Sequence, residues 1–345
     1  MNTEQAWLVV PVMGTVATGF LASMLVTRWL IGYARRREMV DHPDERRLHS
    51  AATPRGGGLA MVVAILAAGL PLAYGYEDRA LGAFLALLAG FAALGWVEDT
   101  RGLAVLPRLV AQLLLAIVAV ALLGGFASLE MFGIFIPAPG WGAVLTVIWI
   151  VALANFYNFM DGIDGLAASQ ASVAALAFGM WFAWNGDYAF ALAAYAIMAS
   201  ALGFLVWNWM PARIFMGDVG SLALGGAFAM LTLIADRRHG IPAGAGVLLL
   251  GVFIADAGVT LVARLKRGEA VWKAHRGHYY QRAVASGMTH AAVTALAMCL
   301  FVVLAVLATL EMKRLQPRPL WALLAAAVLA VAAYAVVRRE KRSQN

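Results

Sequence analysis

The sequence has few charged residues and a single cysteine. Of its 345 residues, 13% are charged and 63% are hydrophobic, and the mean hydropathy is +0.79. Soluble domains are about 45–50% apolar. No polar stretch here exceeds about thirty residues, which is too short to form a soluble core. Cys299 stands alone and excludes an intrachain disulfide. The composition therefore argues against both a soluble domain and a disulfide-stabilised one.

The chain consists instead of apolar runs long enough to cross a bilayer. We expect an all-α polytopic membrane protein, with residues 1–345 forming a single integral-membrane domain. The first run is long and lacks a basic segment before it, so we interpret it as an uncleaved span and not a signal peptide. Residues 126–139 leave room for a re-entrant segment. The eleven expected spans are 6–31, 58–74, 80–97, 109–123, 142–156, 166–184, 188–207, 221–235, 243–262, 290–310 and 320–337.

The basic residues are concentrated in alternate loops. Cytoplasmic loops of membrane proteins are enriched in Lys and Arg. We therefore expect the N-terminus outside and the C-terminus in the cytoplasm. The net charge of +7 is then explained by topology and anionic lipid headgroups, with no nucleic-acid partner. The loops after even-numbered spans carry only Arg79, Arg237, Arg238, Lys313, Arg314 and Arg318.

Four polar side chains lie between the apolar runs 144–154 and 166–182. Asn155, Asn158, Asp161 and Asp164 recur every third position. An ionisable residue beside the membrane is costly to desolvate and points to function. Because a helix has 3.6 residues per turn, one straight helix cannot aim all four at one point. A glycine follows each aspartate and permits a break. We predict a helix that ends near Met160 and a polar turn that faces water.

Two acidic motifs lie at other predicted membrane exits. Glu98-Asp99 could share a divalent cation or supply a base, or it could be a solvated helix end. Asp218 lies between Gly217 and Gly220 just before a span, where it could cap the helix. The flanking glycines also allow a ligand to approach. A carboxylate with nearby oxygen donors suits Mg²⁺.

Two basic motifs lie in predicted cytoplasmic loops. Arg55 precedes three glycines at the start of the second span, which could cradle a phosphate or form an ordinary loop. His275-Arg276-Gly-His278 suits phosphate binding. The two histidines could instead bind Zn²⁺, although no third ligand is evident. The motif could also be a basic loop on anionic lipid.

All of these motifs lie on the predicted cytoplasmic side of the membrane. A transport pathway would instead need ionisable groups near mid-membrane and on both sides. A surface site that combines acidic groups for a divalent metal with basic groups for phosphates favours phosphoryl transfer. The donor would be a soluble nucleotide and the acceptor a lipid.

The motifs resemble those of the polyprenyl-phosphate N-acetylhexosamine-1-phosphate transferases. That superfamily also holds the phospho-N-acetylmuramoyl-pentapeptide transferases. The resemblance covers almost the whole chain and is strongest over residues 40–285. It rests on motifs in the family's order: Thr53-Pro-Arg-Gly-Gly-Gly58, Glu98-Asp99, Asn155-x-x-Asn158-x-x-Asp161-Gly-Ile-Asp164-Gly165, Asn208-x-x-Pro211-Ala-x-x-Phe215-Met-Gly-Asp218-x-Gly-Ser221 and the His-bearing loop.

The resemblance implies a fold, a reaction and a location. The fold is a bundle of ten or eleven helices with a cytoplasmic active-site cleft. The reaction joins the sugar phosphate of a UDP-N-acetylhexosamine to undecaprenyl phosphate and releases UMP, with Mg²⁺ as cofactor and Mn²⁺ as an alternative. The location is the bacterial inner membrane. A homodimer is left open.

The resemblance also implies roles for the acidic residues. Asp218 matches the principal Mg²⁺ ligand, and Asp161 and Asp164 match carboxylates of the metal and nucleotide site. Glu98 and Asp99 match a pair assigned to lipid-phosphate activation or metal contact. The expected catalytic residues are therefore Glu98, Asp99, Asp161 and Asp164, and the expected metal ligands are Asp218 and Asp161.

Other matched positions are implied to bind substrate. Asn208 and Phe215 match positions that hold uracil, and the loop at 275–278 matches one that holds the sugar-phosphate end. The expected substrate-binding residues are Asn158, Asn208, Phe215, Arg55, His275, Arg276 and His278.

Two departures from the family pattern refine the expectation. The acidic pair is usually Asp-Asp, so Glu98 is a weaker candidate than Asp99. The last loop lacks the three consecutive histidines of the muramoyl-pentapeptide branch. That difference favours smaller N-acetylhexosamine donors, as used to start O-antigen and related lipopolysaccharide polymers. The alternatives are a phospho-N-acetylmuramoyl-pentapeptide transferase and, in another class, a lipid-precursor transporter.

Overall fold

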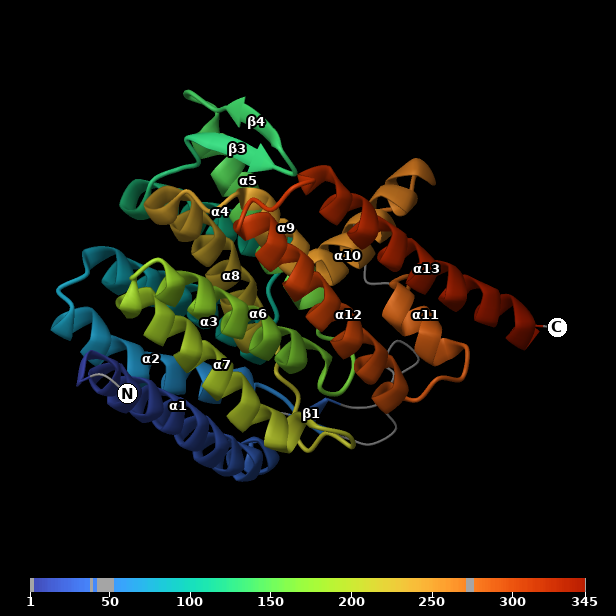
Figure 1. The fold of residues 1–345 in the computed structure, drawn as a ribbon. Coiled ribbons are helices and arrows are strands. Elements are labelled where there is room, and N and C mark those ends of the chain that lie inside the picture. The colour runs from blue at the N-terminus through green and yellow to red at the C-terminus, as the bar shows by residue number, and fades with distance from the viewer. Residues whose placement is uncertain (1–2, 38–39, 42–52, 271–275, 345) are drawn as a thin grey trace.

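The structure is a computed structural model that describes residues 3–37, 40–41, 53–270 and 276–344. It is a bundle of long helices (Figure 1), as expected for an all-α polytopic membrane protein. Among the described helices, ten are long and apolar enough to cross a membrane, and α9 with α10 passes as a bent pair. The helices are α1 (Thr3–Arg36), α2 (Gly58–Gly75), α3 (Arg79–Arg101), α4 (Val105–Leu123), α5 (Gly142–Phe159), α6 (Leu166–Trp184), α7 (Tyr188–Asn208), α8 (Asp218–His239), α9 (Ala243–Leu249), α10 (Gly251–Lys266), α11 (Tyr279–Ala285), α12 (His290–Met312) and α13 (Arg318–Gln344).

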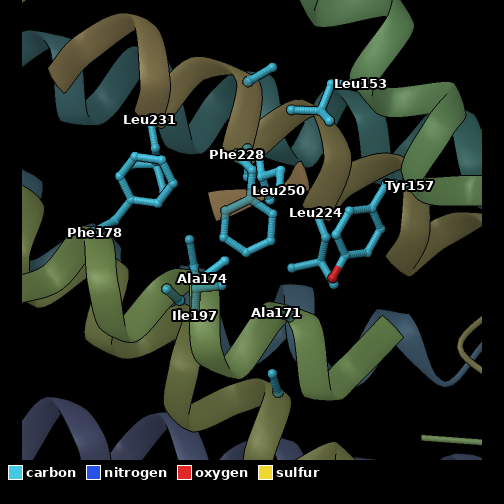
Figure 2. Packing of buried hydrophobic residues seen from close by; sticks show 14 of the residues in the cluster. Leu153, Tyr157, Ala171, Ala174, Phe178, Ile197, Leu224, Phe228, Leu231 and Leu250 are labelled. Atoms are coloured by element: carbon cyan, nitrogen blue, oxygen red, sulfur yellow. The ribbon is translucent and has the colours of Figure 1, made fainter. Parts of the chain in front are cut away.

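Helix α8 lies at the centre of the bundle, and all of its residues from 219 to 235 are buried. Phe228 of α8 packs against Tyr157 of α5 and Phe178 of α6, with ring centroids 5.7 and 6.2 Å apart (Figure 2). Lipid tails are as apolar as these side chains, so helices in a membrane associate through close packing and polar contacts. This packing fixes where α8 begins relative to the ends of its neighbours.

The ninth expected span is broken. Helices α9 and α10 meet at 81°, so the expected span over 243–262 is a bent pair of helices and not one straight helix. The buried side chain of Gln170 in α6 donates from Nε2 to the Leu249 carbonyl oxygen at 3.0 Å. That carbonyl belongs to the last turn of α9, where carbonyls lack intrahelical partners. Gln170 therefore stabilises the break, and α10 beyond it contacts α11.

Residues 128–137 form a β-hairpin in place of the re-entrant segment for which the sequence left room. Strand β3 (Ser128–Met131) pairs antiparallel with β4 (Ile134–Pro137). Arg318 of α13 binds Glu130 of the hairpin at 2.6 Å and the buried Glu311 of α12 at 2.5 Å. Glu311 also accepts a hydrogen bond from the Phe132 N–H at 2.8 Å. These contacts fasten the hairpin to the junction between α12 and α13.

The opposite end of the bundle collects most of the motifs found in the sequence. Strands β1 (Val40–Asp41) and β2 (Thr53–Pro54) pair there ahead of α2. Helices α3 and α5 end at this side, and α8 begins there. The α10–α11 arm reaches the end of α5, because Tyr280 of α11 donates a hydrogen bond to the carbonyl oxygen of Phe159. Motifs separated by more than a hundred residues in sequence therefore meet.

Candidate active site

Helices α3 and α8 touch backbone to backbone where α8 begins. A Cβ on Gly95 would lie 2.2 Å from the carbonyl oxygen of Asp218, so this approach requires glycine. Asp99 follows Gly95 by about one turn and lies on the same face of α3. Its Oδ2 accepts a hydrogen bond from the Val219 N–H at 3.0 Å. Gly217, with φ of +74°, leaves room for this carboxylate, because a Cβ there would lie 2.6 Å from Oδ2. Two glycines thus place the buried Asp99 at the start of α8.

Asp218 is the first residue of α8 and faces the end of α5. Nδ2 of Asn158, in the last turn of α5, donates to Oδ1 of Asp218 and to Oγ of Ser221, both at 2.9 Å. Within the described residues, the other Asp218 oxygen, Oδ2, has no hydrogen-bond partner. Asn158 therefore orients the Asp218 carboxylate and leaves one oxygen for a ligand.

Asp161 lies in the turn between α5 and α6. Helix α5 ends at Phe159, which confirms the predicted helix end, and Gly165 precedes α6 with φ of +72°. The Asp161 carboxylate makes no hydrogen bond or ion pair with any residue that the structure describes. Burial, followed by repulsion from Asp218 and Asp99, raises the pKa of Asp161 to about 8. Asp99, Asp161 and Asp218 therefore form one carboxylate cluster.

The chemistry of the carboxylate cluster fits a divalent cation, which would relieve the repulsion that raises the pKa of Asp161. Mg²⁺ typically binds through one or two carboxylates, with water or phosphate oxygens completing its shell. In the described part of the chain, no three His, Cys, Asp or Glu side chains form a ready ligand set. The residues thus fit a cation held by Asp218 and Asp161 and completed by substrate, and they do not fit a closed structural site.

Glu98 turns away from the carboxylate cluster. Its Oε2 accepts a hydrogen bond from the Leu103 N–H at 2.9 Å, and its Oε1 lies 3.4 Å from Nη1 of Arg108. Adjacent residues of a helix point about 100° apart. The structure therefore joins only Asp99 of this acidic pair to the cluster, while Glu98 caps the end of α3.

Asn208 and Asp164 bind neighbouring backbone. Asn208 is buried, with its Oδ1 accepting from the Gly165 N–H at 3.0 Å and its Nδ2 donating to the Ile214 carbonyl oxygen at 2.9 Å. Oδ2 of Asp164 accepts from the Ala212 N–H at 3.0 Å. These bonds tie the α5–α6 turn to the loop before α8. This geometry does not favour the expected uracil contact of Asn208, since both ends of its carboxamide are used inside the fold.

The glycine run before α2 packs against the loop before α8. The N–H of Gly57 donates to the carbonyl oxygen of Phe215 at 2.9 Å, and the N–H of Gly58 donates to that of Met216 at 2.8 Å. These two N–H groups are therefore engaged, which favours the loop interpretation over a phosphate cradle. The Arg55 guanidinium donates to the carbonyl oxygen of Asp99. Arg55 thus places a cation beside the carboxylate cluster.

The His-bearing loop divides between the protein interior and its surface. His275 lies outside the described residues. Arg276 is exposed, whereas His278 is only 4% exposed and its Nδ1 lies 3.2 Å from Oδ1 of Asp256. No zinc ligand set appears in the described residues. Arg276 is therefore better placed than His278 to meet a ligand, and Asp256 serves as a partner of His278.

Two cavities in the described residues lie away from the carboxylate cluster. One of about 330 Å³ is lined by Asp78, Asp187 and His239 at the opposite end of the bundle. Another of about 400 Å³ lies among apolar residues of α1, α6 and α7. Neither cavity corresponds to the active-site cleft implied by the resemblance, so that cleft stays a prediction.

Comparison with known proteins agrees with this geometry. Residues 81–236 match the model of glycosyl transferase family 4. The matched segment runs from α3 to α8 and contains the whole carboxylate cluster. Alignments with relatives extend the similarity to 80% of the chain. Over residues 81–236 the chain is similar to glycosyl transferase family 4. The family resemblance expected from the motifs is therefore confirmed.

Proteins similar to this chain carry two kinds of name. The chain is 28% identical to a probable undecaprenyl-phosphate N-acetylglucosaminyl 1-phosphate transferase of Bacillus subtilis, over 80% of this chain and 79% of that protein. It is 28% identical to the phospho-N-acetylmuramoyl-pentapeptide-transferase of Bacillus velezensis and 29% identical to that of Geobacillus kaustophilus. Each of these two alignments covers 70% of this chain and 79% of the relative.

Three residues outside the predicted set also contact the predicted site. Ser221 binds Asn158, and it lies one turn after Asp218, which is a signal that the sequence did contain. His290 of α12 lies 3.3 Å from Asp164, and Tyr280 of α11 binds the end of α5. Neither has a local signal, because each partner lies more than a hundred residues away in sequence.

Proposed function

We propose that this protein is a sugar-1-phosphate transferase that acts on a polyprenyl phosphate. In the proposed reaction, an oxygen of undecaprenyl phosphate forms a bond to the β-phosphorus of a UDP-N-acetylhexosamine. The bond between that phosphorus and the bridging oxygen breaks, and UMP leaves. The products are undecaprenyl-diphosphate-sugar and UMP.

The meeting of Asp99, Asp161 and Asp218 at one end of a membrane bundle is the observation that carries the proposal. Phosphoryl transfer depends mainly on positioning and on stabilising charge around the phosphorus, which metal ions and cations supply. This cluster has the acidic groups for a metal and lies where a lipid and a soluble nucleotide can meet. The family 4 match over residues 81–236 supports the same conclusion.

We assign the roles in the site from its contacts. Asp218 and Asp161 would hold Mg²⁺, or Mn²⁺ in its place, and the bound cation would neutralise charge on the phosphoryl oxygens. Asn158 keeps the Asp218 carboxylate in position through its 2.9 Å hydrogen bond. Arg55 and Arg276 offset the diphosphate charge. A phosphate monoester has a second pKa near 6 and is largely a dianion at neutral pH, so a protein base has little to add.

We propose that this end of the bundle faces the cytoplasm of a bacterial cell, with the protein in the inner membrane. The described residues place Arg55, Arg101, Arg108, Arg213 and Arg276 in or beside the loops at this end. Positive residues favour the cytoplasmic side. The N-terminus would then lie outside and the C-terminus in the cytoplasm.

The proposed donor is a UDP-N-acetylhexosamine, and the pathway is the start of O-antigen or a related envelope polysaccharide. The absence of three consecutive histidines after residue 274 supports the smaller donor. The Bacillus subtilis relative, named for N-acetylglucosaminyl 1-phosphate transfer, supports it as well. The relatives named phospho-N-acetylmuramoyl-pentapeptide-transferase make that activity the second candidate.

The test is UMP release by the purified protein in liposomes with undecaprenyl phosphate, Mg²⁺ and a panel of UDP-sugars. We expect release with an N-acetylhexosamine donor and none with UDP-N-acetylmuramoyl-pentapeptide. The reverse preference would favour the second candidate. Movement of a lipid-linked precursor across the membrane without UMP release would instead identify a transporter.

Asp218→Ala tests the metal assignment. We expect UMP release to fall by at least about 10²-fold, because the site loses one of the two carboxylates assigned to the metal. The melting temperature in detergent should stay near that of the wild type. Asp236→Ala is the matched control, since it makes the same change near the opposite end of α8. Full Mg²⁺-dependent activity in Asp218→Ala would refute the assignment.

A further inference from the structure

Tyr280 reaches from α11 to the end of α5. Its side chain is buried, and its hydroxyl donates a hydrogen bond to the carbonyl oxygen of Phe159 at 3.0 Å. Phe159 is the last residue of α5, so its carbonyl has no partner within the helix. The Tyr280 hydroxyl supplies that partner from a helix more than a hundred residues away. Asn158 and Asp161 lie on either side of this bond along the chain.

Gly162 shows how closely the hydroxyl fits the turn. A Cβ on Gly162 would lie 2.0 Å from the Tyr280 hydroxyl oxygen and 2.9 Å from Cζ. The hydroxyl therefore packs directly on the backbone between Asp161 and Asp164, in space that any side chain at 162 would occupy. Tyr280 thus touches the turn at two points, the carbonyl at 159 and the backbone at 162.

Tyr280 is itself firmly held. Oδ1 of Asp256 accepts from the Tyr279 N–H at 2.9 Å, and Oδ2 accepts from the Tyr280 N–H at 3.1 Å. The Tyr280 ring also stacks on the ring of His278, with centroids 5.9 Å apart and an interplanar angle of 18°. Asp256 lies on α10, beyond the bend that follows α9. The broken span therefore has a consequence for the site, because it carries the group that anchors α11.

We propose that Tyr280 is a positioning residue whose hydroxyl fixes the turn at 160–165, and with it Asn158 and Asp161, relative to Asp218. Without the hydroxyl, the Phe159 carbonyl would lose its partner and the turn would be free to shift. Displacement of a reacting group by about 1 Å can lower a rate by about 10²-fold. The role in turnover rests on the proposed transferase function, whereas the hold on the turn does not.

The experiment compares Tyr280→Phe with Tyr279→Phe in the full-length protein in liposomes. Both variants remove one hydroxyl from adjacent tyrosines, but the Tyr279 hydroxyl has no hydrogen bond among the described residues. For Tyr280→Phe we expect kcat of UMP release to fall about tenfold, as for the loss of one hydrogen bond, and KM for both substrates to stay within about twofold. We also expect faster hydrogen exchange in amides 160–166. Tyr279→Phe should match the wild type in every respect.

Gly162→Ala supplies an independent arm. The new Cβ should displace the Tyr280 ring and lower kcat in the same way. In the double variant with Tyr280→Phe, the atom at 2.0 Å is gone. We therefore expect the combined loss to be smaller than the product of the two single losses, as for residues that act through one contact.

The two readouts separate the proposals. Unchanged exchange at 160–166 in Tyr280→Phe would overturn the hold on the turn, whatever the activity. Faster exchange in Tyr280→Phe with unchanged kcat would overturn the positioning role. A variant that differs from the wild type only in a lower melting temperature would overturn it as well. If the wild type releases no UMP with any UDP-sugar, the transferase proposal fails, and with it the positioning role in turnover. The exchange data would still decide whether Tyr280 holds the turn.

Discussion

Replacing Gly95 by alanine tests the contact that brings Asp99 to the start of α8. An alanine Cβ would lie 2.2 Å from the Asp218 carbonyl oxygen and 2.5 Å from the Val219 nitrogen. Both are backbone atoms, so no change of rotamer relieves the clash. To reach an ordinary contact of 3.4 Å, the two helices must separate locally by about 1.2 Å. The 3.0 Å hydrogen bond from Val219 to Asp99 would then break.

This displacement sets the expected magnitudes. Overpacking a well-packed interface typically costs about 1–3 kcal/mol, and moving a reacting group by about 1 Å costs about 10²-fold in rate. We therefore expect Gly95→Ala to lower the melting temperature in detergent and to reduce kcat/KM for UMP release by about 10²-fold. The measurements are thermal unfolding and the liposome assay, made on the same preparation.

Gly82→Ala is the matched control because it makes the same change in the same helix. No atom lies within 4 Å of a Cβ at Gly82. Alanine exceeds glycine in helix propensity by about 0.8–1.0 kcal/mol, so this variant should be as stable as the wild type or more stable, with full activity. A kcat/KM for Gly95→Ala within about threefold of the wild type would refute the role of the close contact. An equal loss of activity in both variants would mean that any glycine-to-alanine change in α3 lowers activity, and that the close contact at Gly95 is not the cause.

Two further predictions concern charge at the two ends of the bundle. The pKa of Asp161 rises from 3.8 to about 8 in the fold, so between these values the folded state binds a proton that the unfolded state has lost. The unfolding free energy of the metal-free protein should therefore fall as pH rises from about 4 to about 8. In Asp161→Asn the melting temperature should fall less over this pH range. An equal fall in melting temperature in the variant and the wild type would contradict the assignment to Asp161. At the far end, Glu311→Gln removes the buried one of the two carboxylates that pair with Arg318 and leaves only Glu130. It should destabilise the protein by up to about 3–5 kcal/mol. Arg314→Gln removes an exposed partner of Glu130 and should change stability by about 1 kcal/mol or less, and equal shifts in unfolding by the two variants would contradict the assigned burial.

The sequence by itself determined the membrane architecture and the end of α5. In lipid every backbone N–H and C=O must be satisfied internally, so a long apolar run must be helical whatever surrounds it. The same local logic located the break after Phe159, because Asn155, Asn158, Asp161 and Asp164 cannot share one helical face. Asp218 between its glycines was also evident from the chain alone.

Tertiary structure decided which polar residues meet. Asp99 joins the carboxylate cluster and Glu98 does not, because only Asp99 lies on the face of α3 that Gly95 brings against α8. Asn208 was expected at a ligand but is used by backbone groups of the adjacent loops. Hydropathy predicted one span over 243–262, whereas the chain bends by 81° at a carbonyl that Gln170 satisfies.

The physical reason for this division is the range of the interactions. Span length and helix breaks depend on neighbouring residues and on the bilayer, and both leave a pattern in the sequence. The contacts of Gly95 with Asp218, and of Tyr280 with Phe159, join segments more than a hundred residues apart. They depend on how helices pack, which the periodicity of either segment alone does not specify.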